Sequence, residues 1–142
     1  MIEIHRATPA DARWVTTALG NIYHGEVGNE TRLAAVLENP DFVLLLAKRE
    51  SRTAGYLQGH VLDRLDGGRM MLIYDLTVHE AERRRGTATA LLEQCFELAA
   101  KQGASRSWLV TEPGNEPARA LYLTLGGVEG PAVGFQFDPG PA

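Results

Sequence analysis

Hydrophobic positions recur along the chain with two different spacings, and the spacing changes several times. Alternation of apolar and polar residues, or a short apolar run between turn signals, is typical of a β-strand. This pattern predicts six strands, over residues 2–7, 42–49, 53–62, 70–78, 105–111 and 132–137.

Between these strands, apolar residues recur every three or four positions, as they do in amphipathic helices. Four helices are therefore expected, over residues 9–20, 30–38, 86–103 and 116–126. Thr8, with Asp11 three residues later, predicts a capping box, and Asn29 predicts the cap of the second helix. The element order predicts an α/β domain with a mixed sheet and helices on both faces, in which strands 70–78 and 105–111 run parallel.

Length and composition narrow the class of protein further. The 142 residues fit a single domain over 1–142, and 44% hydrophobic with 23% charged residues is typical of a globular protein. A net charge of -4 gives no reason to expect nucleic acid as a partner. No apolar run approaches the roughly 18 residues of a membrane span. Cys95 is the only cysteine, so we expect no disulfide within the chain and a cytoplasmic location.

The stretch "EAERRRGTATALLEQC", residues 80–95, joins a strand to a helix and carries the first chemical signal. The first turn of a helix has N–H groups without partners and the positive end of the helix dipole. Gly86 and Ala88 leave the approach to these groups open, and Arg83–Arg85 add positive charge. This arrangement suits a pyrophosphate. The alternative is a solvated basic loop that precedes an amphipathic helix.

Arg83, Gly86 and Ala88 fit the pattern [Arg/Gln]-x-x-Gly-x-[Gly/Ala], which resembles the acetyl-coenzyme A loop of the GNAT N-acetyltransferase superfamily. The segment Asp75–Val78 ends five residues before Arg83, as in that family, and Asn115–Tyr122 resembles its second coenzyme segment. The G-x-G-x-x-G and G-x-x-x-x-G-K-[ST] phosphate motifs are absent from the sequence. The resemblance implies a GNAT fold with a central mixed sheet of six to seven strands and four flanking helices.

Three longer stretches, "IYDLTVHEAERRRGTATALL", "EPARALYLTLGG" and "FQFDP", are similar to the aminoglycoside 3-N-acetyltransferases of the gentamicin-resistance type. The N-terminal half matches that group weakly, and Asn115 stands where the group has an acidic residue. The resemblance implies direct transfer of an acetyl group from acetyl-coenzyme A to an amino group of an aminoglycoside, expected to be the 3-amino group, and hence antibiotic resistance.

The resemblance also implies that the end of the central strand, the loop after it and the second segment hold acetyl-coenzyme A. The residues expected to bind it are Leu76, Thr77, Val78, Arg83, Arg84, Arg85, Gly86, Thr87, Ala88, Thr89, Asn115, Ala118 and Tyr122.

Two side chains are candidates for proton transfer. Asp75 interrupts an apolar strand, and a carboxylate there is costly unless it is paired or lies at a cleft. We expect it to accept the ammonium group and help to remove its proton, directly or through water; the alternative is a solvated strand face. The hydroxyl of Tyr122, with an ordinary pKa of about 10, is the candidate acid for the leaving thiolate; the alternative is a packing residue.

A polycationic acceptor needs carboxylates in its pocket. The residues expected to form this pocket are Tyr23, His24, Glu26, Tyr74, Asp75, Glu112, Glu116 and Asp138. The alternative for each of Glu26, Glu112, Glu116 and Asp138 is an ordinary acidic residue of the surface. The four histidines show no metal-binding spacing with each other or with Cys95, so no metal is expected.

Other functions and assemblies stay open at this point. The runner-up function is an acetyltransferase for another small amine, a protein N-terminus or a lysine. A third hypothesis is a regulatory module that binds the coenzyme without catalysis. The strand expected over 132–137 would also offer an edge through which two copies could form a homodimer.

Overall fold

The computed structural model describes residues 1–20, 22–23 and 27–140. The chain forms two compact units, Met1–Val110 and Thr111–Ala142. The expectation of one domain over the whole chain stays a prediction. No helix among the described residues has the length and apolar character that crossing a membrane requires.

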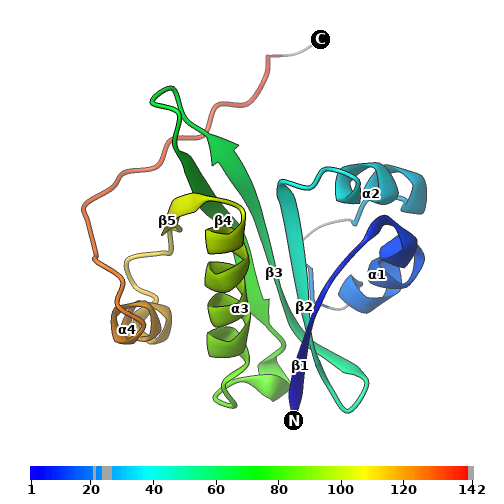
Figure 1. Cartoon of the computed structure of the whole chain (residues 1–142). Helices are drawn as coiled ribbons and strands as arrows, with labels where there is room; N and C mark the ends of the chain where they lie inside the picture. Colours follow the sequence, from blue (N-terminus) through cyan, green and yellow to red (C-terminus); the bar gives the residue numbers. More distant parts are fainter. Residues whose placement is uncertain (21, 24–26, 141–142) are drawn as a thin grey trace. The chain divides into compact units, whose positions relative to one another are not determined.

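The first unit contains a five-stranded mixed sheet whose strands follow one another in sequence order (Figure 1). Its strands are β1 (Ile2–Arg6), β2 (Phe42–Arg49), β3 (Arg52–Asp63), β4 (Arg69–Val78) and β5 (Ala104–Trp108). All neighbours pair antiparallel except β4 and β5, which are parallel as predicted.

The four predicted helices are present. They are α1 (Ala12–Leu19), α2 (Glu30–Leu37), α3 (Thr87–Lys101) and, in the second unit, α4 (Glu116–Thr124), with short 3-10 turns η1 (Pro9–Asp11) and η2 (Glu80–Glu82). Both predicted caps form: Thr8 N donates to Asp11 Oδ2 at 2.8 Å, and Arg32 N donates to Asn29 Oδ1 at 2.8 Å.

Helices cover both faces of the sheet, which explains why β2 is apolar along most of its length. Leu44 and Leu46 share a buried cluster with Val15 of α1 and Leu37 of α2. Helix α3 contacts all five strands from the other side (Figure 1). Each fully buried leucine contributes roughly 1.5–3 kcal/mol to the hydrophobic stabilisation of this two-sided core.

A β-bulge in β4 changes which residues face each side of the sheet. Gln58 of β3 is opposite Asp75, but the next residue, Gly59, is opposite Ile73, so Tyr74 has no residue opposite it. One extra residue in a strand reverses the side-chain alternation beyond that point. Asp75 therefore faces the α1–α2 side of the sheet, whereas Ile73 faces α3.

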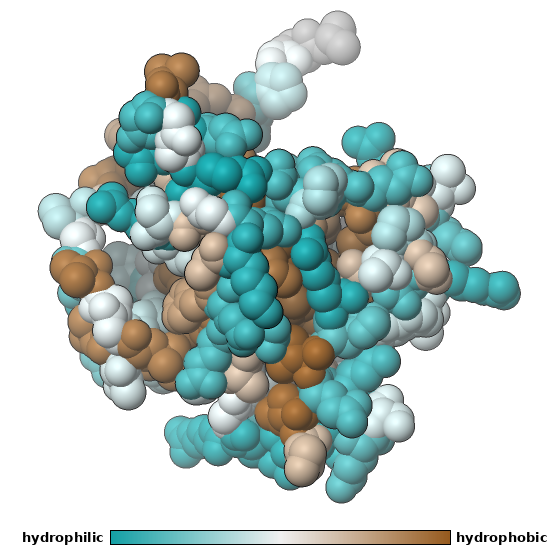
Figure 2. Space-filling model, in the orientation of Figure 1, coloured by the Kyte–Doolittle hydropathy of each residue, from teal (hydrophilic) through white to brown (hydrophobic). Residues whose placement is uncertain are grey.

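The predicted strand 132–137 is wrong, and the sheet has five strands rather than six to seven. None of the described strands pairs with this segment, in which Val133, Phe135 and Phe137 are 81%, 81% and 89% exposed. A strand is stable only where a neighbour satisfies its backbone groups, and Gly134 at its centre lowers the local preference for one. Figure 2 shows the mixture of hydrophilic and exposed hydrophobic residues on one face of the structure.

Candidate active site

The carboxylate of Asp75 lies among polar partners on the α1–α2 side of the sheet. The Tyr56 hydroxyl donates a hydrogen bond to Asp75 Oδ2, and Thr77 Oγ1 donates to Asp75 Oδ1 at 3.2 Å. Tyr56 is buried, at 1% exposure, whereas Asp75 is partly exposed. Asp75 is therefore a paired carboxylate with access to solvent, and not a residue of a fully solvated strand face.

Tyr56 is a further candidate site residue, and it was not predicted from the sequence. Burial raises its pKa well above the ordinary 10.0, and the hydrogen bond to Asp75 raises it further, so the hydroxyl stays protonated and acts as a donor. The stretch "GYLQG" could have indicated Tyr56, because Tyr56 and Gln58 place polar groups on one face of an otherwise buried strand. Their position beside Asp75 depends on the register between β3 and β4.

A pocket of about 100 Å³ adjoins this polar group, between α1, α2, β2 and β3. Tyr23, Tyr56 and Gln58 contribute its polar atoms, and the rest of the lining is mostly apolar. The rings of Tyr23 and Tyr56 lie 5.9 Å apart between centroids. Tyr23 thus lines a pocket, and its role in binding an acceptor stays a prediction, whereas His24 and Glu26 lie outside the described residues.

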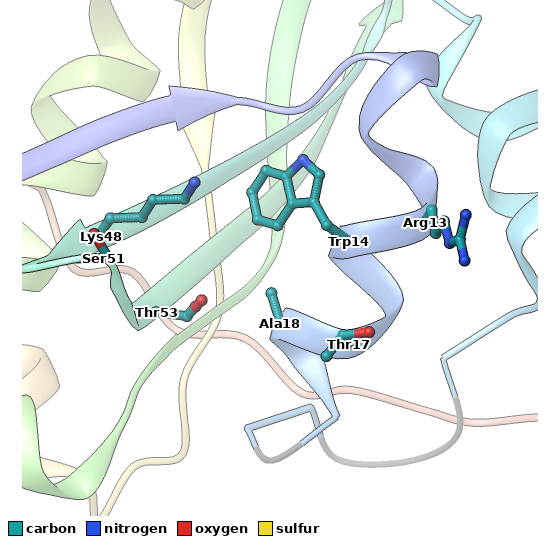
Figure 3. Close-up of a pocket in the computed structure, with 7 residues that line it drawn as sticks. All are labelled: Arg13, Trp14, Thr17, Ala18, Lys48, Ser51 and Thr53. Carbon is teal, nitrogen blue, oxygen red and sulfur yellow. The ribbon is translucent and has the colours of Figure 1, made fainter.

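A larger hollow of about 460 Å³ lies between α1 and the β2–β3 turn (Figure 3). Lys48 Nζ lies 4.0 Å from the centre of the Trp14 ring at this hollow, and Arg13 is also part of the lining. No carboxylate is among the described residues that line it. Its positive charge is therefore wrong for a cationic acceptor. The described lining of the smaller pocket carries no charged side chain and includes Tyr56, the hydrogen-bond partner of Asp75, so it is the better candidate.

The edge of β4 next to β5 is paired only over its first part. The parallel pairing runs from Arg69 to Leu72, and within the described chain Ile73–Val78 pairs with β3 alone. Backbone groups along this edge can therefore bind an extended ligand that carries amides. The Val78 carbonyl already accepts a hydrogen bond from Arg83 Nε at 3.4 Å.

The loop between η2 and α3 leaves open space at an uncapped helix N-terminus. Arg84 and Gly86 have left-handed φ angles of 63° and 80°, and no side chain caps the N-terminus of α3 at Gly86. A Cβ added at Gly86 would meet nothing within 4 Å, so the space there is open. The first helical hydrogen bond runs from Ala90 N to Gly86 O at 3.0 Å, which leaves the amides of the first turn to other acceptors.

The three predicted arginines are not equivalent. Arg83 donates to the Val78 carbonyl, and Arg85 Nη1 lies 3.2 Å from Glu82 Oε2. Glu82 is buried, at 5% exposure, and also pairs with Arg49 and Arg52. Glu82 was not among the residues predicted to form the site, because its two partners from the β2–β3 hairpin are distant in sequence.

The second unit holds the remaining predicted residues. Asn115 caps α4, since its Oδ1 accepts from Ala118 N at 3.2 Å. Burial raises the pKa of Tyr122 above its ordinary 10.0. The predicted acceptor residues of this unit, Glu112, Glu116 and Asp138, are all exposed, and so is Tyr74 at the bulge of the first unit.

Two further features concern metal and thiol chemistry. No group of His, Cys, Asp and Glu among the described residues is placed to hold a metal ion. Cys95 is fully buried on α3, and burial raises its pKa to about 11. Its interpretation as a core residue is confirmed, because a buried thiol in apolar surroundings is a poor nucleophile.

Residues 11–126 match the Acetyltransferase (GNAT) family. The chain is also 32% identical over 96 residues to the uncharacterized N-acetyltransferase YhfO of Bacillus subtilis (strain 168). That match covers 67% of this chain and 64% of the length of YhfO. The chain therefore belongs to the GNAT acetyltransferase family.

Solved structures agree with this assignment. An aminoglycoside acetyltransferase, HMB0005, from an uncultured soil metagenomic sample superposes with a TM-score of 0.90 at 29% identity, over 98% of this chain and 99% of that chain. A second aminoglycoside acetyltransferase from such a sample, in complex with sisomicin, has a TM-score of 0.84 at 18% identity, over 97% and 96% of the two chains. The second likeness is one of fold alone.

Proposed function

We propose that the protein is an acetyl-coenzyme A-dependent N-acetyltransferase that acetylates an amino group of an aminoglycoside, expected to be the 3-amino group. The observation that carries the proposal is the course of β4. This strand places Asp75 beside hydroxyl partners on one face, has an unpaired edge after Leu72, and leads through η2 to the uncapped N-terminus of α3.

The residues of the first unit fit the coenzyme, which would supply the thioester whose acetyl group is transferred. The amides of Arg84–Thr89 would bind its diphosphate, because they combine open space, the helix dipole and nearby arginines. The edge of β4 at Leu76–Val78 would bind the amides of its pantetheine arm. A backbone N–H near Leu76 facing the thioester carbonyl would lower the barrier by about 3 kcal/mol.

Asp75 would attract the acceptor ammonium and pass its proton to water. Both of its oxygens already accept hydrogen bonds from Tyr56 and Thr77, which fix the direction of the carboxylate. The neutral amine would then attack the thioester carbonyl carbon, the carbon–sulfur bond would break, and the nitrogen would lose its second proton to water. This second proton replaces the one that the leaving thiolate takes up. The proton lost by the ammonium goes to solvent, so the reaction releases one acid equivalent.

Tyr122 would donate its hydroxyl proton to the departing thiolate and regain a proton from water. The assignment rests on the resemblance of Asn115–Tyr122 to the second coenzyme segment of the family. The hydroxyl is protonated at neutral pH, as a proton donor must be, but burial raises its pKa and so makes it a weaker acid than an ordinary tyrosine.

The 29% identity and full-length likeness to an aminoglycoside acetyltransferase support the drug as acceptor. One observation favours the runner-up, a peptide N-terminus, a lysine or another small amine. The pocket beside Tyr56 has a volume of only about 100 Å³ and a mostly apolar lining, whereas drug-sized ligands usually occupy pockets of roughly 300–1,000 Å³. Such a pocket suits an acceptor that inserts one small apolar group.

A panel of acceptors separates these functions. Release of free coenzyme A would be followed with gentamicin, sisomicin, polyamines and short peptides, and the product would be mapped by NMR. We expect turnover with gentamicin and acetylation of one amino group. Turnover with peptides but with no aminoglycoside would favour the runner-up.

Two variants test the third hypothesis, a regulatory module without catalysis. For such a module, Asp75→Asn and Tyr122→Phe would leave the activity in cells unchanged while acetyl-coenzyme A still bound. Loss of resistance in both variants would instead support the enzyme.

A further inference from the structure

Glu82 is a buried acidic residue immediately before the loop proposed to bind the diphosphate. It is 5% exposed, and a carboxylate is rarely buried to this extent unless it is paired. Its Oε2 accepts from Arg49 Nε at 3.0 Å and from Arg85 Nη1 at 3.2 Å. Its Oε1 lies 3.6 Å from Arg52 Nη2. Three guanidinium groups therefore surround one carboxylate.

These contacts fasten the loop to the sheet. Arg49 ends β2, and its Nη2 also donates to the backbone carbonyl of Arg85 at 3.3 Å. The backbone carbonyl of Glu82 accepts from Thr87 Oγ1 at 3.4 Å, and Thr87 is itself buried, at 2% exposure. The loop is thus held at both ends, by Arg49 at Arg85 and by Thr87 at Glu82.

The loop conformation needs such support. Arg84 has a φ of 63°, a left-handed conformation that is unfavourable for any residue with a Cβ. It persists only where the surrounding contacts hold it. A left-handed residue beside a right-handed one, such as Gly86 before helical Thr87, turns successive amides toward one side, which forms a concave site for an anion.

The arginines differ in their freedom to move. The side chain of Arg49 is 11% exposed, whereas that of Arg85 is 48% exposed. Arg85 can therefore turn toward an anion while Arg49 and Arg52 continue to neutralise Glu82. A buried carboxylate left with no partner would be costly, but here two partners remain.

We propose that Glu82, held by Arg49, is a positioning residue for the diphosphate of acetyl-coenzyme A. It fixes the backbone of residues 83–87 so that the amides face the diphosphate, and it holds Arg85 until the ligand takes that guanidinium. This inference rests on the proposed function and deepens it, since Glu82 itself does not touch the ligand.

Charge alone predicts the opposite result, which makes the inference testable. Removal of a negative charge beside an anion site should strengthen the binding of a polyanion. Removal of a positioning group should weaken it, because the loop and the buried Arg49 rearrange. The direction of the change in affinity on Glu82→Gln therefore decides between the two effects.

The experiment is calorimetric titration of acetyl-coenzyme A into the full chain, together with steady-state kinetics and melting curves. For Glu82→Gln we expect the Kd and the KM for acetyl-coenzyme A to rise on the order of tenfold, as for loss of a hydrogen-bonded residue that orients the groups in contact with a ligand. The kcat and the KM for the acceptor should change less than about twofold, because the reacting groups are untouched. Glu80→Gln is the matched control, since Glu80 is exposed on the same 3-10 turn.

Arg49→Lys and Arg49→Met provide a second pair of variants. Arg49→Lys keeps a positive charge beside Glu82, so it should retain part of the affinity for acetyl-coenzyme A that Arg49→Met loses. If Glu82→Gln does not fold, this pair decides the question, and equal affinities of both variants and the wild type overturn the inference. Unchanged or tighter binding by folded Glu82→Gln also overturns it. Absence of binding by the wild type would instead refute the proposed function.

Discussion

Asp75 and Glu82 are two carboxylates of the first unit with contrasting surroundings. Asp75 is hydrogen-bonded by the neutral hydroxyls of Tyr56 and Thr77 and remains partly exposed. Glu82 is 5% exposed and surrounded by the guanidinium groups of three arginines. Asp75 on β4 and Glu82 on η2 are close in sequence, but one carboxylate is hydrogen-bonded by neutral hydroxyls and the other is paired with cations.

The difference in partners gives the two regions opposite electrostatic character. Hydroxyl donors orient Asp75 without cancelling its negative charge, so that region suits an ammonium group. Three arginines exceed the charge of Glu82, so the region at the start of α3 suits an anion. An enzyme that joins a polyanionic donor to a cationic acceptor requires both regions.

Asp75→Asn removes the negative charge of the Asp75 region and should cause the largest loss of activity among the variants of the two regions. The amide keeps the size of the side chain but loses the charge that attracts the ammonium and the capacity to take its proton. We expect kcat/KM for the acceptor to fall on the order of 100- to 1,000-fold. The measurement is acceptor-dependent release of coenzyme A, with the Kd for acetyl-coenzyme A as the internal control. Wild-type turnover by the variant would remove Asp75 from the chemistry.

Gly59→Ala should disturb the Asp75 region alone. A Cβ at this position would lie 2.9 Å from the Leu72 carbonyl oxygen and 2.9 Å from Met71 Sδ, so β4 must shift near its bulge. We expect the free energy of unfolding to fall by roughly 1–3 kcal/mol, as measured by urea denaturation. Activity should fall while folded protein still binds acetyl-coenzyme A. A loss of stability below the experimental error would show that β4 absorbs the methyl group.

Tyr56→Phe should have a smaller effect, because it removes one hydroxyl from Asp75 and leaves the ring in place. We expect kcat/KM to fall about tenfold and stability by about 1 kcal/mol.

The pH dependence of stability provides a separate measure of Tyr56. Its pKa is raised in the folded state, so its contribution is fully present below pH 10.0 and is lost as the pH rises through the folded pKa. Melting curves of the wild type should therefore show a decline above pH 10.0 that Tyr56→Phe reduces. An identical decline in both proteins would assign it to other groups.

Features formed by neighbouring residues could be predicted from the sequence. The caps at Thr8 and Asn29 and the glycine at the start of α3 depend on residues within a few positions of one another. The family pattern around Arg83 and Gly86 is likewise continuous in sequence. These local signals were sufficient for the five strands of the sheet, the four helices and the uncapped start of α3.

Features that depend on distant segments could not be predicted. The contact between Tyr56 and Asp75 requires the register of β3 and β4 and the bulge at Tyr74. The pairing of Glu82 with Arg49 requires the β2–β3 hairpin to reach η2. The error at residues 132–137 has the same origin, because alternation records a local preference and carries no information about a partner strand.

The central claim is that the amides at the start of α3 bind the diphosphate of acetyl-coenzyme A. Calorimetric titration of the wild type, Gly86→Val and Gly67→Val tests it most directly. Both glycines have a left-handed φ, 80° and 83°, and neither has an atom within 4 Å of an added Cβ, so the two substitutions impose the same backbone strain. We expect binding by the wild type and by Gly67→Val, and a Kd raised on the order of tenfold or more in Gly86→Val, where the side chain occupies the anion site. No heat from the wild type, or equal affinity in both variants, would contradict the claim.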